Sequence, residues 1–97
     1  MSLKHIPNQF HIMKSTRKNK KYVAMFKNGI TIHFGDNRYS DFTIHKDTER
    51  KRLYLLRHGN EDWNNAYSAG SLSRYILWNL PTLEASIQDF KKRFNLV

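Results

Sequence analysis

The chain has 97 residues and is strongly basic, with 17 Lys and Arg against eight Asp and Glu, and this length allows one hydrophobic core and therefore one domain. The absence of Cys excludes disulfides, thiolate catalysis and cysteine-based zinc sites. No apolar run approaches the roughly 18 residues of a membrane span, and the N-terminus lacks the apolar segment of a signal peptide. We therefore expect a protein that is neither secreted nor transmembrane.

The positive charge is concentrated at the start of the chain. Residues 1–35 contain seven Lys or Arg and no acidic residue, whereas residues 61–97 contain four basic and four acidic residues. Such an unbalanced field attracts polyanions and speeds encounters with them. Nucleic acid is therefore the partner that the composition favours.

Three segments near the N-terminus have the alternation and the β-branched and aromatic residues of strands. We predict strands over about 9–14, 22–26 and 30–34, after a flexible arm formed by residues 1–8. Asn28-Gly29 precedes the third strand, and because both residues tolerate positive φ, the pair indicates a hairpin with a tight primed turn. The three strands would form an antiparallel meander, which needs a cover on one face to be stable.

Three helices are expected to supply that cover by packing on one face of the sheet. We predict them over about 47–58, 71–78 and 82–94, with Asp47 or Thr48 able to cap the first helix. The fold class is therefore α+β, with residues 9–97 forming a single domain. The oligomeric state stays open.

The helical projections predict which side chains face the sheet. In the first helix Leu53 and Leu56 fall together and should contact the sheet. Arg50, Tyr54 and Arg57 form the adjoining stripe, because spacings of three and four return to one side of a helix. The last helix has a stripe of four apolar residues that we assign to the core, namely Leu83, Ile87, Phe90 and Phe94.

Nucleic-acid binding requires cations that neutralise phosphates and, for a single strand, aromatic rings that stack on bases. Tyr22 and Tyr39 are the candidate stacking residues. One basic group would lie at the loop and hairpin ends of the sheet and a second on the first helix. The ten candidate contacts are Lys14, Arg17, Lys18, Lys20, Lys21, Lys27, Lys46, Arg50, Lys51 and Arg52. Since the sequence has no helix-turn-helix, ribonucleoprotein motif or zinc finger, we predict binding to DNA or RNA without sequence readout.

A metal-dependent nuclease is one alternative, because the stretch from residue 33 to residue 63 is rich in imidazoles and carboxylates. The candidate catalytic residues would then be His33, Asp36, His45 and Glu61. No spacing matches a metal signature, and the paired histidine one helical turn apart is missing. We therefore favour a protein without catalysis, metal or cofactor.

The acidic residues of this stretch also have a structural interpretation. Asp36 and Asp41 would cap turns or pair with Arg38. Glu61 and Asp62 would pair with basic residues of the first helix, either Arg57 or Arg50. Networks of this kind fix loops in position without performing chemistry.

Short polar and aromatic motifs are spread over the central and C-terminal parts of the chain. They are His33-Phe34-Gly35-Asp36, Tyr39, Asp41, His45-Lys46-Asp47, Arg50, Arg57-His58, Glu61-Asp62-Trp63, Ser73-Arg74, Leu77-Trp78-Asn79 and Pro81-Thr82-Leu83. The combination, over roughly residues 22–94, resembles a family of small basic proteins of large nucleocytoplasmic DNA viruses that infect algae and protists. The resemblance implies a viral source rather than an activity.

The leading hypothesis is a small basic viral protein, located in the virion or in the cytoplasm or nucleus of the infected cell, that binds nucleic acid non-specifically through phosphates. The other alternative is a minor capsid or scaffold protein whose basic face contacts acidic coat proteins. An exposed apolar patch around Tyr67, Leu72 and Tyr75 would favour that alternative.

Overall fold

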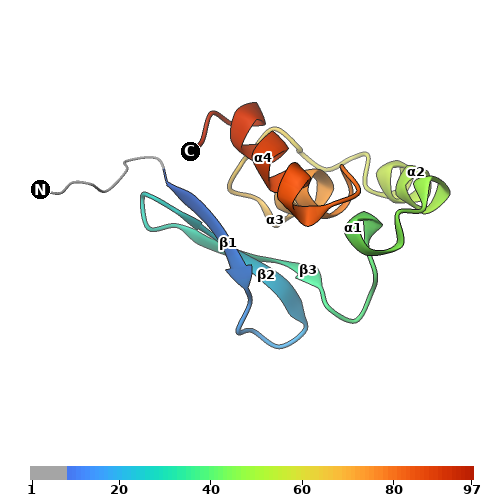
Figure 1. The fold of residues 1–97 in the computed structure, drawn as a ribbon, viewed down its shortest axis with the longest axis horizontal. Helices are drawn as coiled ribbons and strands as arrows, with labels where there is room; N and C mark the ends of the chain where they lie inside the picture. Colours follow the sequence, from blue (N-terminus) through green and yellow to red (C-terminus); the bar gives the residue numbers. More distant parts are fainter. Residues whose placement is uncertain (1–8) are drawn as a thin grey trace, which may run out of the picture.

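The computed structural model describes residues 9–97, so the predicted N-terminal arm lies outside the described residues. The elements are β1 (Phe10–Lys14), β2 (Lys20–Phe26), β3 (Thr31–Asp36), α1 (Phe42–His45), α2 (Thr48–Arg57), α3 (Ala69–Leu72), a π-helical segment η1 (Ser73–Leu77) and α4 (Leu83–Arg93). Three antiparallel strands are followed by helices, which confirms the predicted α+β class (Figure 1). None of the described helices is long and apolar enough to cross a bilayer.

The sheet is the predicted meander, in the order β1-β2-β3. The Phe26 amide donates a 2.9 Å hydrogen bond to the Ile30 carbonyl, so three residues rather than two connect β2 to β3. Within this loop only Gly29 has a positive φ, of 92°. The hairpin is confirmed, but the tight primed turn is wrong, because a three-residue loop needs one left-handed residue and Gly29 alone supplies it.

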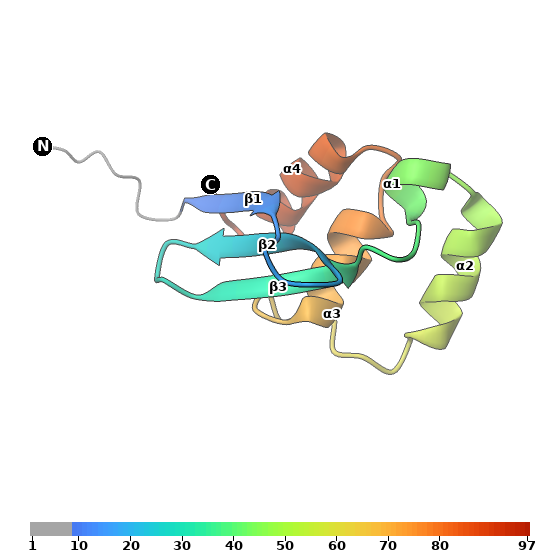
Figure 2. The ribbon, with the colours of Figure 1, turned by 90° about the horizontal axis from the view of Figure 1, so that it is seen from below.

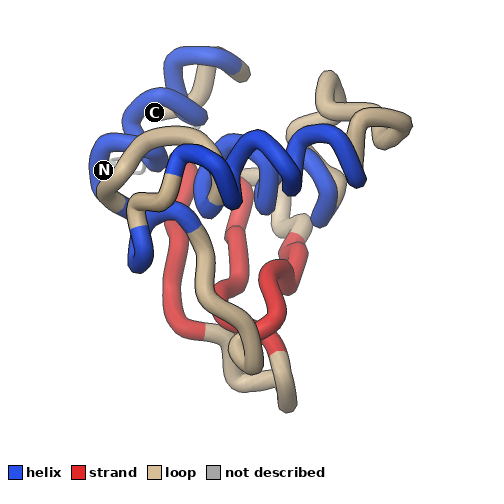
Figure 3. The backbone as a smooth tube through the Cα atoms, turned by 90° about the vertical axis from the view of Figure 1, so that its right-hand side faces the viewer, coloured by secondary structure: helices blue, strands red, loops and turns tan. Residues whose placement is uncertain are grey.

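In Figure 3 the sheet forms one layer and the helices form another. The core lies between one face of the sheet and the C-terminal helices. The Phe90 ring of α4 stacks on Phe10 of β1, with ring centroids 5.2 Å apart. The other three residues of the predicted α4 stripe are partly buried against this cluster, which confirms their assignment to the core. The buried residues of the cluster are Phe10, Ala24, Phe26, Phe34, Leu72, Ile76, Leu77 and Phe90.

Helix α2 lies beyond the end of the sheet rather than on its face (Figure 2). Leu53 and Leu56 are 39% and 67% exposed, so their predicted contact with the sheet is wrong. The buried residue of α2 is Tyr54, whose ring is nearly parallel to that of Trp78 at a centroid distance of 4.5 Å. Leu53 and Leu56 lie three residues apart and provide apolar surface over a single helical turn only. The larger Tyr54 ring buries more apolar area, so it determines which face of α2 points inward.

A short helix that the sequence does not predict, α1, connects β3 to α2. Its N-cap is Asp41, which accepts from the Thr43 amide at 2.9 Å. The same carboxylate forms an ion pair with Lys21 of β2, and both side chains are nearly inaccessible. Because a buried charge requires a partner, this pair fixes α1 to the sheet.

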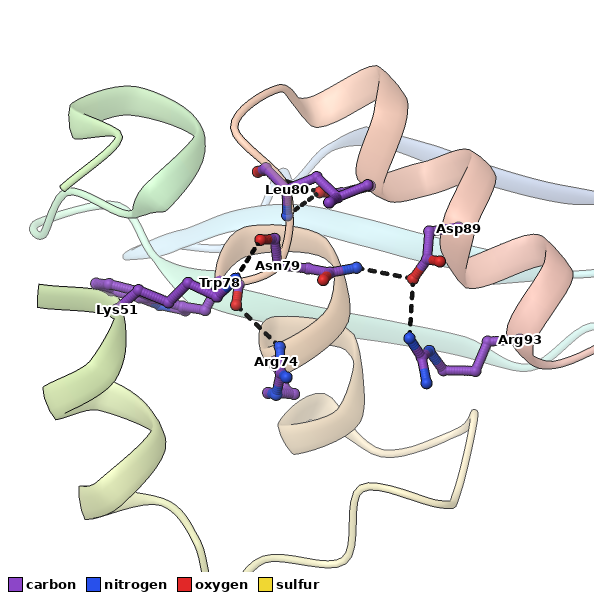
Figure 4. Close-up of polar contacts among 8 residues, drawn as sticks. Lys51, Arg74, Trp78, Asn79, Leu80, Asp89 and Arg93 are labelled. Atoms are coloured by element: carbon purple, nitrogen blue, oxygen red, sulfur yellow. Dashed lines mark hydrogen bonds and ion pairs between the residues drawn. The ribbon is translucent and has the colours of Figure 1, made fainter. Parts of the chain in front are cut away.

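The predicted helix over 71–78 exists, as α3 continuing directly into η1. The Trp78 amide donates to the Ser73 carbonyl at 3.1 Å, the i→i+5 bond of a π-helix. Two cations bind carbonyls at the end of η1: Lys51 donates to Asn79 at 2.7 Å and Arg74 to Trp78 at 2.9 Å (Figure 4). The Lys51 bond connects α2 to the end of η1, the Arg74 bond lies within the η1 segment and its cap, and the Asn79 side chain donates to Asp89 of α4.

Candidate nucleic-acid interface

A cleft of about 690 Å³ is lined by residues from the end of the sheet, from helix α2 and from the α3–η1 segment. The sheet contributes Lys20 and Asp36, and the connector after β3 contributes Tyr39. Helix α2 contributes Arg50 and Arg57. The cleft therefore brings together basic residues that are far apart in the sequence.

The wall between β3 and η1 depends on a close approach at Gly35. Its φ is +79°, and a Cβ atom there would lie 2.8 Å from Leu77 Cδ1. Any other residue would be strained by the backbone conformation, and its Cβ atom would require the Leu77 side chain to move. Gly35 thus allows β3 to pack closely against the Leu77 side chain at one side of the cleft.

Two acidic residues of the cleft are neutralised by basic residues close to them. Arg38 donates to both carboxylate oxygens of Asp36, at 2.9 and 2.7 Å, and these bonds lower the pKa of Asp36 to about 2. Asp41 is held by Lys21. The predicted Asp36–Arg38 pair is confirmed, whereas Asp41 pairs with a strand residue instead of Arg38.

Glu61, the third acidic residue of the cleft, lies 2.5 Å from His58 Nδ1. The predicted pairing of Glu61 with Arg57 or Arg50 is wrong, because His58 caps the end of α2 next to the turn that carries Glu61. Because Glu61 contacts His58 instead, Arg50 and Arg57 form no ion pair within residues 9–97 and can bind an anionic ligand.

The cations left without an ionic partner in the cleft are Lys20, Arg50 and Arg57, as judged over residues 9–97. Arg50 and Arg57 lie on the same side of α2 as Tyr54, which confirms the predicted stripe. Asp36 and Asp41 are already ion-paired with Arg38 and Lys21, so these three cations leave the cleft with an excess of positive charge. The cleft can therefore accept an anionic ligand.

The ten predicted phosphate contacts fall into two groups. Four of them bind the protein itself: Lys21 to Asp41, Lys46 to the Thr43 carbonyl, Lys51 to the Asn79 carbonyl and Arg52 to Glu49. Burial lowers the pKa of Lys51, with a smaller contribution from Arg74. Within the described part of the chain, the charged groups of the remaining six form no ion pair or hydrogen bond, namely Lys14, Arg17, Lys18, Lys20, Lys27 and Arg50.

The loop between β1 and β2 carries several of these free cations and continues into the cleft at Lys20. Ser15 Oγ lies 2.7 Å from His33 Nδ1 and accepts from the Arg17 amide at 3.0 Å, so the start of the loop is held against β3. The pKa of His33 is lowered by burial and further by the charges of Arg17 and Lys20. Lys20, which follows this loop in the chain and lines the cleft, therefore connects the two groups of cations.

The four residues considered for catalysis are not brought together. Asp36 and Glu61 line the cleft, while His33 bonds to the loop and His45 Nδ1 accepts from the Asp47 amide at 2.9 Å. Between residues 9 and 97 no group of three His, Asp or Glu could hold a metal ion. The geometry gives no support to a metal-dependent nuclease.

The exposed apolar patch around Tyr67, Leu72 and Tyr75 that would favour the capsid or scaffold alternative is not formed, although Tyr67 itself is 42% exposed. Leu72 is fully buried, and the Tyr67 ring packs edge-on against Phe26 at 4.6 Å. The Tyr75 ring is covered by the Arg93 guanidinium at 4.1 Å. The feature that would favour a capsid or scaffold role is therefore missing from this surface.

One residue of the cleft, Arg57, was assigned incompletely from the sequence. Arg57 belongs to the predicted stripe of α2 but was not among the phosphate contacts, although its seven-residue separation from Arg50 places both on one face. Tyr39, a predicted stacking residue, lines the cleft and is 69% exposed. The other predicted stacking residue, Tyr22, lies partly buried beside Phe34.

Comparison with known proteins gives one match. Residues 10–58 match a family of unknown function (DUF5754), a segment that covers half of the chain and contains the sheet, α1 and α2. It therefore includes the sheet side and the α2 side of the cleft. No curated protein and no solved structure matches the chain. The chain belongs to the family DUF5754.

Proposed function

We propose that this protein binds nucleic acid non-specifically, through contacts between its basic residues and phosphates. The proposal is carried by the cations of the β1–β2 loop and of α2 that form no ion pair within residues 9–97. Lys20 lies between the two groups, because it follows the loop and lines the cleft with the α2 arginines. A cation that is already paired with a carboxylate gains little from contact with a phosphate. A free cation that contacts a phosphate displaces a counterion condensed on the nucleic acid, and this release favours binding.

The distribution of charge supports the same function. The first 35 residues have no acidic residue, so nothing on β1, β2 or their loop would repel a polyanion. The proposal includes a location in a virion or an infected cell, for which the only support is the resemblance to viral proteins.

The test is the affinity for mixed-sequence DNA and RNA between about 50 and 200 mM salt, where phosphate contacts weaken most visibly. Each contact to a single strand contributes about −0.7 to the slope of log K against log salt. The variant Arg17→Ala/Lys18→Ala should therefore have a slope smaller by about 1.4. Binding should be similar for different base sequences.

The matched control is Lys91→Ala/Lys92→Ala, which removes the same charge from the last turn of α4, outside the proposed surface. Its slope should equal that of the wild type. Absence of binding at low salt, or binding that is indifferent to salt, contradicts the proposed function.

A further inference from the structure

We propose that the cleft holds one nucleoside phosphate unit of a single strand, with the phosphate bound by Arg50 and Arg57 and the base stacked on Tyr39. This inference rests on the proposed function and specifies the form of nucleic acid that the protein prefers. It makes the cleft the point where bases are contacted, while the β1–β2 loop contacts phosphates only.

The charge arrangement of the cleft suits a phosphate on its α2 side. Of the three carboxylates in the lining, Asp36 and Asp41 form ion pairs with Arg38 and Lys21, and Glu61 contacts His58 Nδ1 at 2.5 Å. Arg50 and Arg57 lie two turns apart on α2 and have no ionic partner in the described residues. A guanidinium offers several N–H donors in a plane, which matches the oxygens of a phosphodiester.

Tyr39 supplies the surface for a base. Its side chain is 69% exposed, and no aromatic ring of residues 9–97 stacks on it. The other aromatic residues of the cleft, Tyr54 and Trp78, are stacked on each other. A free aromatic ring binds any base, so it adds affinity without sequence preference.

The size and lining of the cleft favour a single strand over a duplex. A volume of about 690 Å³ is within the range of sites for small ligands. Leu53 and Leu77 add apolar surface beside the polar groups. The bases of a duplex are already stacked on one another, so a duplex presents mainly its phosphates and can use the loop but not Tyr39.

The experiment compares a mixed-sequence single strand, its duplex and a nucleoside monophosphate, each titrated against wild type and variants by fluorescence anisotropy or calorimetry. Tyr39→Leu should weaken binding of the single strand about tenfold and leave duplex binding unchanged. Tyr39→Phe, which keeps the ring, should bind as the wild type does. Arg50→Ala/Arg57→Ala should weaken single-strand binding more than the Lys91→Ala/Lys92→Ala control.

The outcomes separate this inference from the proposed function. If the wild type binds neither strand nor duplex, the proposed function fails and the cleft assignment fails with it. If nucleic acid binds but Tyr39→Leu and Arg50→Ala/Arg57→Ala bind the single strand as the wild type does, only the cleft assignment is overturned. A nucleoside monophosphate that binds as tightly as the strand overturns the assignment to a strand. Because Tyr39 and both arginines are exposed, circular dichroism of the variants should match the wild type.

Discussion

The region under α4 and the region around α2 are stabilised in different ways. Under α4, Phe10, Phe34 and Phe90 are at most 2% exposed and form one continuous apolar cluster. Helix α2 is held instead by single contacts, the Tyr54–Trp78 stack and the Lys51–Asn79 hydrogen bond. One half of the molecule thus depends on summed apolar area, and the other on a few defined pairs.

This difference has a consequence for the cleft. Helix α2 does not lie on the face of the sheet (Figure 2), and its Arg50 and Arg57 line the cleft together with residues from the end of the sheet. A helix packed by its leucines would have filled that space. The attachment of α2 by one aromatic stack and one hydrogen bond, rather than by packing on the sheet, therefore leaves room for a ligand.

The largest effect is expected in the apolar core. Phe90→Ala should lower the free energy of unfolding by about 3–5 kcal/mol, because it removes a fully buried ring and leaves a cavity. Leu56→Ala on α2, which is 67% exposed, should change it by less than about 0.5 kcal/mol. Urea unfolding measures both, and similar losses for the two variants would contradict the contrast between the regions.

The buried Lys21–Asp41 pair should come next. Lys21→Met leaves a carboxylate that is 2% exposed without its counter-ion, and we expect a loss of about 3 kcal/mol. Lys20→Met, at the neighbouring exposed position, is the control and should be close to neutral in stability. If Lys21→Met were equally neutral, the pair would not be what fixes α1 to the sheet.

A smaller effect is expected for the aromatic attachment of α2. The coupling between Tyr54→Leu and Trp78→Leu in a double-mutant cycle should be about 0.5–1.5 kcal/mol, the range for stacked rings. A second double-mutant cycle, with Leu53→Ala and Trp78→Leu, tests the alternative that a leucine of α2, rather than Tyr54, attaches the helix to Trp78. A larger coupling to Leu53 would show that the leucines hold α2 after all.

The smallest effect is a dependence of stability on pH at His45. Burial lowers the pKa of His45, and the nearby charge of Arg50 lowers it further, so the folded state favours the neutral ring. Stability should therefore be complete above about pH 6.5, the ordinary value, and decrease as the pH falls from there toward the lower folded pKa. His45→Asn, which can still accept from the Asp47 amide, should reduce this slope in urea unfolding. An unchanged slope would exclude His45 as its source.

The parts of the fold that follow from repeated local patterns were predictable. The three strands, the Asp47 cap and the apolar stripe of α4 each combine several residues that indicate the same element. The placement of α2 was not predictable, because it depends on one ring meeting Trp78 from a distant segment. Helix α1 depends similarly on the long-range Lys21–Asp41 pair.

The same distinction applies to the candidate site. Charge composition identified the loop cations, because no acidic residue lies near them in the sequence. Both Lys20 and Lys21 line the cleft, but charge composition could not show that Lys20 is exposed while Lys21 is nearly inaccessible and paired with Asp41, since the strand alternation and the position of Asp41 decide this. Arg57 was recoverable from its helical spacing to Arg50.

The most direct test of the central claim is an NMR titration of amide shifts with a mixed-sequence single-stranded oligonucleotide. The expected result is that the largest changes map to residues 17–20 and to Tyr39, Arg50 and Arg57, and weaken together as salt is added. The equally basic end of α4, Lys91–Arg93, should change little. Changes concentrated on that end of α4, or no changes at low salt, would contradict the account.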